Sequence, residues 1–188
     1  MKYKTYIFDF DYTLADATVG MTLGNILFTL TGISDKGSAE QFISHFMYMA
    51  DKVITNSTVL FPDTISVLSQ LKERCCNTAI VTTKVRYRVE EALSKYDIVG
   101  LIDYIAGLED VTAPKPSPEG ILKAISYFGS DKHDVLFIGD SLLDANAAAG
   151  ADVDFAAVLT GATPKQDFLS LPHILIAKSL TEIIEHTC

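Results

Sequence analysis

Short apolar runs, rich in β-branched and aromatic residues, alternate along this chain with segments whose apolar residues recur at helical spacing. This alternation predicts a parallel sheet covered by helices on both faces, a Rossmann-like three-layer α/β/α fold. The runs are almost continuously apolar, as strands are when both faces of a sheet are buried. The expected strands are Thr5 to Phe10, Thr78 to Thr82, Tyr104 to Ala106, Val135 to Ile138, Phe155 to Leu159 and Ile174 to Ile176. The expected helices are Thr64 to Arg74, Arg86 to Lys95, Pro118 to Phe128, Asp144 to Ala149, Thr163 to Ser170 and Leu180 to His186.

One region interrupts this alternation. Between about Thr18 and Ser57 no strand is expected, and apolar residues recur at helical spacing on both sides of a Gly/Ser/Asp turn. We interpret this region as a small helical cap inserted after the first strand, with its Met and Phe residues serving as packing surface. The predicted domains are an α/β core of residues 1–16 and 60–188 and a reduced cap of residues 17–59. After the insertion, Asp63 or Thr64 is expected to cap the next helix.

Composition narrows the class of partner. The formal net charge is -9 and no long cluster of Lys and Arg occurs, which argues against nucleic acid and anionic membranes. No stretch approaches the roughly 18 uninterrupted apolar residues of a membrane helix. The N-terminus has no signal-like apolar region, so we expect a cytoplasmic protein with no membrane partner. Cys75, Cys76 and Cys188 suit neither a disulfide framework nor a zinc site, and reduced thiols are the simplest account.

Polar residues gather where the first two expected strands end. Asp9 and Asp11 follow the first strand, and two carboxylates this close are costly to bury unless a cation or a proton offsets them. Thr82 and Thr83 follow the second strand, where hydroxyls and free backbone amides can clamp phosphate oxygens. The threonines alone are weak evidence, because Thr is common in strands.

Two later segments add a cation and more carboxylates. Lys115 lies between two prolines that stiffen its backbone, although a surface loop ahead of a helix would look the same. Asp140 follows an apolar strand, and Asp144 stands near the start of a helix, either as a further ligand or only as its cap. Such hard oxygen ligands suit Mg²⁺.

The carboxyl ends of parallel strands share one edge of an open sheet, where ligands bind, so these residues are expected to meet there. Two nearby carboxylates, further acids for a metal, a hydroxyl and amide clamp and one lysine are what phosphoryl transfer to an aspartate requires. An anionic nucleophile and an anionic phosphate repel each other unless Mg²⁺ and an ammonium lie on the oxygens.

The chain resembles the haloacid dehalogenase superfamily of phosphatases, whose motifs occur here in the same order. They are Asp-x-Asp-x-Thr at 9–13, the strand-end Thr82, Lys115, and Gly-Asp-Ser-x-x-Asp at 139–144. Three further segments are similar to the phosphoglycolate phosphatase and β-phosphoglucomutase branch: Leu108-Glu-Asp-Val, Lys115-Pro-Ser-Pro-Glu and Ala148-Ala-Gly-Ala. The similarity covers nearly the whole chain outside the insertion.

This resemblance implies a role for each residue. Asp9 would be the nucleophile that forms an aspartyl-phosphate, and Asp11 would protonate the leaving oxygen and then deprotonate the hydrolytic water. The residues expected to hold Mg²⁺ are Asp9, the backbone carbonyl of Asp11, Asp140 and Asp144, the last directly or through water. Those expected to hold the phosphate are Thr82, the Thr83 amide and Lys115.

The cap departs from the branch, which usually inserts four or more helices. Only about forty residues separate Asp16 from Leu60. A reduced cap would leave the site open to larger phosphoesters, borrow a lid from a second subunit, or slow turnover. Its apolar stripe, if uncovered, favours a homodimer through the cap.

The sequence therefore predicts a Mg²⁺-dependent phosphatase of a small phosphorylated metabolite, similar to phosphoglycolate phosphatase. A β-phosphoglucomutase-like phosphotransferase is the second candidate, although a reduced cap argues against an enzyme that must exclude water. A core that binds phosphate or Mg²⁺ without catalysis is the non-enzymatic alternative. A dehalogenase would need neither Mg²⁺ nor Asp11, and a signalling receiver domain would carry an acid where this chain has Thr82.

Overall fold

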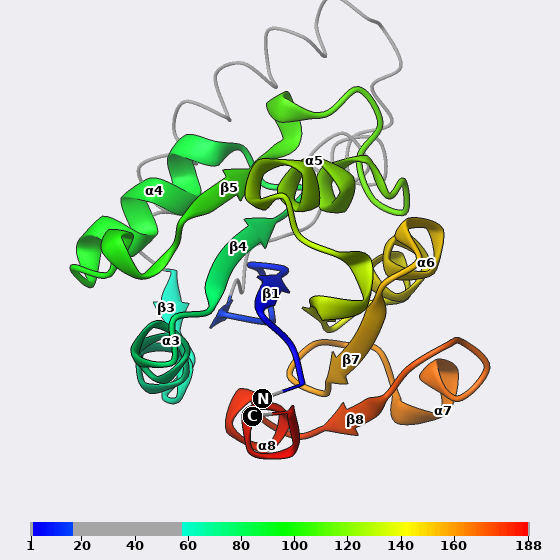
Figure 1. The fold of residues 1–188 in the computed structure, drawn as a ribbon. Coiled ribbons are helices and arrows are strands. Elements are labelled where there is room, and N and C mark those ends of the chain that lie inside the picture. Colours follow the sequence, from blue (N-terminus) through cyan, green and yellow to red (C-terminus); the bar gives the residue numbers. More distant parts are fainter. Residues whose placement is uncertain (1, 17–57, 188) are drawn as a thin grey trace, which may run out of the picture. The chain divides into compact units, whose positions relative to one another are not determined.

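Six strands form a parallel sheet in the order β5-β4-β1-β6-β7-β8, with helices on both faces (Figure 1). The computed structural model describes residues 2–16 and 58–187. The sheet confirms the predicted α/β fold. Its strands are β1 (Thr5–Phe8), β4 (Asn77–Val81), β5 (Tyr104–Ala106), β6 (Val135–Gly139), β7 (Asp154–Val158) and β8 (Leu175–Ala177). A separate two-stranded sheet pairs β2 (Ala15–Asp16) with β3 (Val59–Leu60).

Burial on both faces explains why the strands are apolar throughout. All four residues of β1 and all five of β6 are buried. The first face is covered by α3 (Thr64–Glu73), α4 (Arg86–Lys95) and α8 (Leu180–Thr187), and the second by α5 (Glu119–Phe128), α6 (Leu142–Ala151) and α7 (Lys165–Phe168). Three layers therefore enclose two apolar cores, one on each side of the sheet.

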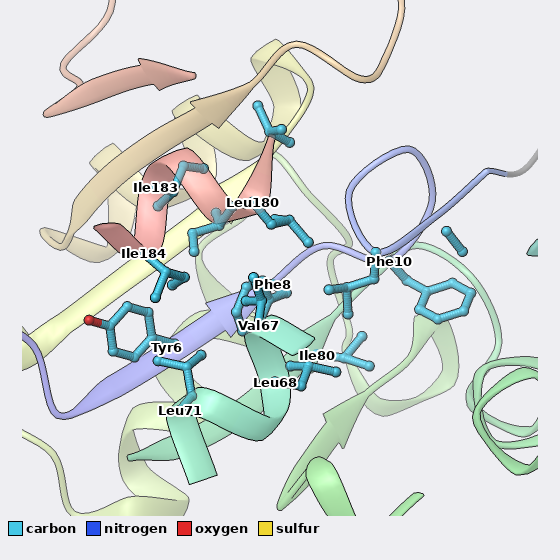
Figure 2. Close-up of a cluster of buried hydrophobic side chains, with 14 of the residues drawn as sticks. Tyr6, Phe8, Phe10, Val67, Leu68, Leu71, Ile80, Leu180, Ile183 and Ile184 are labelled. Atoms are coloured by element: carbon cyan, nitrogen blue, oxygen red, sulfur yellow. The ribbon is translucent and has the colours of Figure 1, made fainter. Parts of the chain in front are cut away.

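On the first face, side chains of α3 and α8 pack against the central strand β1 (Figure 2). Leu68 of α3 and Ile183 of α8 are fully buried, as is Phe8 of β1 between the two helices. Burying an aliphatic or aromatic side chain of this size stabilises the fold by roughly 1.5–3 kcal/mol. This packing holds β1, and hence the residues that follow it, in the middle of the sheet.

The element boundaries follow the sequence closely. The helix Arg86–Lys95 and the strand Tyr104–Ala106 match the prediction to the residue, and the other predicted elements differ by one or two residues at an end. The helix α6 begins at Leu142, before the predicted start at Asp144, because Ser141 is its N-cap.

The predicted cap of α3 is confirmed in its position but not in its side-chain bond. Asp63 occupies the N-cap position, but its side chain makes no bond to α3. Its Oδ2 instead accepts hydrogen bonds from the backbone nitrogen and the hydroxyl of Thr181, at 2.9 and 3.1 Å. Thr64 donates its hydroxyl to the carbonyl of Leu14, at 2.7 Å. A distant segment that needed an acceptor, the first turn of α8, thus outcompeted the local cap.

The chain divides into two units, Met1–Asp16 with Leu60–Cys188, and Ala17–Val59. The predicted cap helices, and the homodimer through the cap, fall on residues outside those that the structure describes and stay predictions. No helix between residues 58 and 187 is both long enough and apolar enough to cross a membrane.

Candidate active site

Strand register places the acidic residues at one edge of the sheet. Phe8 of β1 is paired with Ile138 of β6, and the Asp9 nitrogen donates to the Ile138 carbonyl at 2.8 Å. Asp9 is therefore the first residue beyond β1 and lies alongside the end of β6. Asp140 is the first residue beyond β6. This edge is where the carboxyl ends of the parallel strands meet, as expected for a ligand site in an open α/β sheet.

The chain folds back immediately after Asp9. The backbone nitrogens of Leu14 and Ala15 both donate to the carbonyl of Phe10, at 2.9 and 3.1 Å. Within this turn, Tyr12 has a φ of 57°, a left-handed conformation that is uncommon for a residue with a side chain. This tight turn keeps Asp9, Asp11 and Thr13 at the end of β1 rather than carrying them away from the sheet.

Lys115 joins two of the acids. Its ammonium nitrogen lies 2.7 Å from Oδ1 of Asp9 and 2.6 Å from Oδ1 of Asp144, and its side chain is only 5% exposed. Burial alone would lower the pKa of Lys115, but the two carboxylates outweigh burial and raise it. Lys115 therefore stays protonated and neutralises part of the negative charge around it.

Three carboxylates form a buried cluster. Asp9, Asp140 and Asp144 each offer an oxygen, and these oxygens lie within 4.8 Å of one another. Burial raises the pKa of Asp9 to about 7 and that of Asp140 to about 6. One ammonium thus leaves three acids incompletely neutralised, and their hard oxygen atoms fit a divalent cation such as Mg²⁺.

Asp144 serves the cluster and the helix together. Its Oδ2 accepts from the backbone nitrogen and the hydroxyl of Ser141, at 3.0 and 2.5 Å, in a capping box at the start of α6. A Cβ on Gly139 would lie 2.5 Å from the Asp144 Cγ, so only glycine lets this carboxylate pack so closely. The two interpretations of Asp144, a helix cap or a member of the acidic site, both hold geometrically.

Asp11 lies outside the carboxylate cluster. Its side chain is 25% exposed, and its Oδ1 lies 2.8 Å from the ammonium of Lys84, whose side chain is 10% exposed. The geometry misses the angles of a hydrogen bond, so the contact is an ion pair. Lys84 was not among the predicted site residues; its place directly after two strand-end threonines was the available signal.

The strand-end threonines sit one strand away from Asp9. β4 pairs with β1 in parallel, with Ile80 opposite Phe8, which brings Thr82 to the same edge. Thr82 is buried, and its hydroxyl oxygen accepts a hydrogen bond from the backbone nitrogen of Lys84 at 3.1 Å. The hydroxyl proton of Thr82 is therefore free for another acceptor. Thr83 is exposed. Their roles in phosphate binding stay predictions.

A second missed residue lies after β7. A Cβ on Gly161 would overlap Oδ2 of Asp140 and lie 2.6 Å from its Cγ. Nothing in the local sequence around Gly161 distinguishes it from an ordinary turn glycine, because the conflict arises only when β6 and β7 are side by side.

Comparison with known proteins identifies the family of this chain. The family model of haloacid dehalogenase-like hydrolases matches residues 18–158, three quarters of the chain. The chain belongs to this family. The resemblance predicted from the four motifs is thereby confirmed.

Relatives of this haloacid dehalogenase-like protein include pyrophosphatases and phosphoglycolate phosphatases. Pyrophosphatase PpaX of Bacillus velezensis is 31% identical over 69% of this chain and 60% of its own length. Phosphoglycolate phosphatase of Haemophilus influenzae is 30% identical over 60% of this chain and 50% of its own length. The chain thus spans about half the length of the curated relatives it matches.

A solved structure matches nearly all of this chain. A protein of Bacteroides fragilis, described as a haloacid dehalogenase-like hydrolase, has a TM-score of 0.86 and 36% identity over 97% of this chain and 100% of its own. The match therefore extends over almost the whole length of both chains.

Proposed function

We propose that this chain is a Mg²⁺-dependent phosphatase that hydrolyses a small phosphorylated metabolite through an aspartyl-phosphate on Asp9. The observation that carries the proposal is the position of the Lys115 ammonium between Asp9 and Asp144, with Asp140 in the same carboxylate cluster. An ammonium and a divalent cation on one side of a buried carboxylate are what an attack on an anionic phosphate needs.

The proposed chemistry has two steps. An oxygen of Asp9 attacks phosphorus, the bond from phosphorus to the leaving oxygen breaks, and Asp11 supplies the proton that this oxygen needs. Asp11 then takes a proton from water, whose oxygen attacks phosphorus and releases Asp9 as inorganic phosphate forms. Asp11 loses a proton in the first step and regains one in the second. Asp9 is phosphorylated in the first step and freed in the second, so both residues end the cycle as they began it.

The ligands proposed for the cation are Asp9, Asp140 and Asp144, with the backbone carbonyl of Asp11 as the family resemblance implies. Mg²⁺, when bound, would offset the charge of the phosphoryl oxygens that repel Asp9. Lys115 would contact the same oxygens, and the Thr82 hydroxyl and Thr83 amide would orient them from β4. We place this reaction in the cytoplasm.

Two substrate classes are proposed, in order. The first is a phosphomonoester of the phosphoglycolate type, as in the named phosphatase relatives. The second is pyrophosphate, which is favoured by the pyrophosphatase relatives and by Lys84, since its ammonium beside Asp11 would face the anionic group that leaves. The β-phosphoglucomutase-like alternative ranks below both, because the relatives above are named for hydrolytic reactions.

The test is hydrolysis of p-nitrophenyl phosphate with Mg²⁺ and with EDTA, using Asp9→Asn as the control. We expect turnover with Mg²⁺, none with EDTA, and none in Asp9→Asn. Beryllofluoride, which mimics a phosphoryl group on a carboxylate, should bind the unaltered protein and not Asp9→Asn, as read by ¹⁹F NMR.

Two results would reject parts of this proposal. Turnover that survives Asp9→Asn would rule out the covalent step on this residue. Absence of turnover with every divalent metal, together with Mg²⁺ binding by calorimetry, would favour the binding core without catalysis. A panel that includes phosphoglycolate, pyrophosphate and β-glucose 1-phosphate would then rank the substrate classes.

A further inference from the structure

The turn after β7 reaches the acidic site from the side opposite β4. β7 lies next to β6 in the sheet, so the residues after its last residue, Val158, arrive beside Asp140. Backbone pairing continues into this turn, since the Leu159 nitrogen donates to the carbonyl of Ala177 at 2.9 Å. The turn therefore begins as an extension of the sheet, with limited freedom to shift.

Thr160 anchors the same turn to the loop that carries Asp9 and Asp11. Its hydroxyl donates to the carbonyl of Tyr12, the residue in the left-handed conformation. Thr160 is part of a segment more than a hundred residues away in the chain, so this contact ties two ends of the site together. With sheet pairing on one side and Tyr12 on the other, the turn has little room to retreat.

Gly161 follows directly, against the side chain of Asp140. An added Cβ would overlap Oδ2 and would lie 2.6 Å from Cγ and 2.9 Å from Cβ of Asp140. The backbone of Gly161 is outside the left-handed region, so an alanine is allowed by its φ and only space opposes it. Three atoms of a short side chain are involved, so rotation of the carboxylate alone does not relieve the conflict.

The space left by Gly161 determines where Asp140 points. The opposite carboxylate oxygen, Oδ1, accepts from the Thr13 hydroxyl at 3.4 Å, and Asp140 is only 6% exposed. The Asp140 carboxylate thus fits between Gly161 and the loop after β1, in reach of Asp9 and Asp144. Any side chain at position 161 would push it from this location.

We propose that Gly161 is a positioning residue: it holds open the space in which the Asp140 carboxylate lies, and so sets the affinity of the site for a divalent cation. The inference rests on the proposed role of Asp140 in metal binding. Gly161 itself contributes no ligand atom to the site and acts only through Asp140.

The test compares Gly161→Ala with Gly100→Ala by calorimetric titration with Mg²⁺. Gly100 is a matched control, because an added Cβ there would meet nothing within 4 Å. We expect Gly161→Ala to bind Mg²⁺ roughly 10- to 100-fold more weakly, as substitutions behind a metal ligand do. Gly100→Ala should bind as the unaltered protein does. Unchanged Mg²⁺ affinity in Gly161→Ala would overturn the proposal.

A double-mutant cycle on unfolding, in EDTA, tests the steric step without metal. Gly161→Ala should destabilise the protein clearly more than it destabilises the Asp140→Ala variant, which lacks the carboxylate that would be displaced. Equal losses in the two backgrounds would refute the contact on which the inference stands. If the unaltered protein binds no Mg²⁺, the proposed function fails, and this cycle still decides whether Gly161 positions Asp140.

Discussion

The ammonium nitrogen of Lys115 lies 2.7 Å from a carboxylate oxygen of Asp9, and both side chains are largely buried. The same ammonium bonds to Asp144 at 2.6 Å. The site therefore concentrates one positive charge among three acids, and its stability, metal binding and proposed chemistry all depend on how that charge is shared.

Replacing Lys115 by Met should destabilise the metal-free protein by about 3–5 kcal/mol, because it leaves buried carboxylates without their cation. Urea unfolding in EDTA near neutral pH measures this loss. The matched control is Lys123→Met, since Lys123 pairs with Glu119 on an exposed surface of α5 and should cost far less. Similar losses for the two variants would show that the buried pairs do not stabilise the fold.

The free energy of unfolding should depend on pH through Asp140. Burial raises its pKa to about 6, so the folded chain binds this proton more tightly than the unfolded chain does. The resulting stabilisation is complete below the unfolded pKa, near 4, and is lost as the pH rises through about 6. Asp9, raised to about 7, acts in the same direction.

Asp140→Asn isolates this effect. In EDTA, the unaltered protein should lose stability relative to Asp140→Asn as the pH rises from about 4 to about 7. Carboxylates with lowered pKa, such as Asp103 and Asp110, are the same in both proteins and cancel in the difference. A difference that stays constant with pH would contradict the raised pKa of Asp140.

Asp11→Asn should lower turnover according to the leaving group. If Asp11 donates the proton, its loss should reduce kcat by about 10²- to 10⁴-fold for an alkyl phosphate, whose leaving oxygen needs that proton. The reduction should be smaller for p-nitrophenyl phosphate, which leaves readily as an anion. Equal reductions for both substrates would assign Asp11 to the second step alone.

Lys84→Met should discriminate between the two substrate classes. Loss of a charge-assisted contact to an anionic leaving group predicts a fall in kcat/KM of roughly 10- to 100-fold for pyrophosphate. A much smaller fall is expected for p-nitrophenyl phosphate. Lys4→Met is the control, because Lys4 pairs with Asp134 at a 76% exposed position before β1. A uniform fall on both substrates would mean that Lys84 acts only by holding Asp11.

Local patterns in the chain were enough to predict most of the elements and the residues of the acidic site. The strand at Tyr104–Ala106 and the helix at Arg86–Lys95 carry their own periodicity and boundaries. Asp9 and Asp140 could be selected because each acid directly follows an apolar run, and Lys115 because two prolines flank it. These patterns are local in the sequence, so they can be recognised without knowing which segments are adjacent in the fold.

The contacts of Asp63, Lys84 and Gly161 could be recognised only once the chain was folded. Asp63 is of a residue type that commonly caps helices, but its side chain bonds to Thr181. Lys84 follows β4 and pairs with Asp11, which follows the neighbouring strand β1. Gly161 matters because β7 lies beside β6, which brings it against Asp140. Strand order and the packing of two helical layers decide which distant segments meet, and no periodicity within a segment encodes that choice.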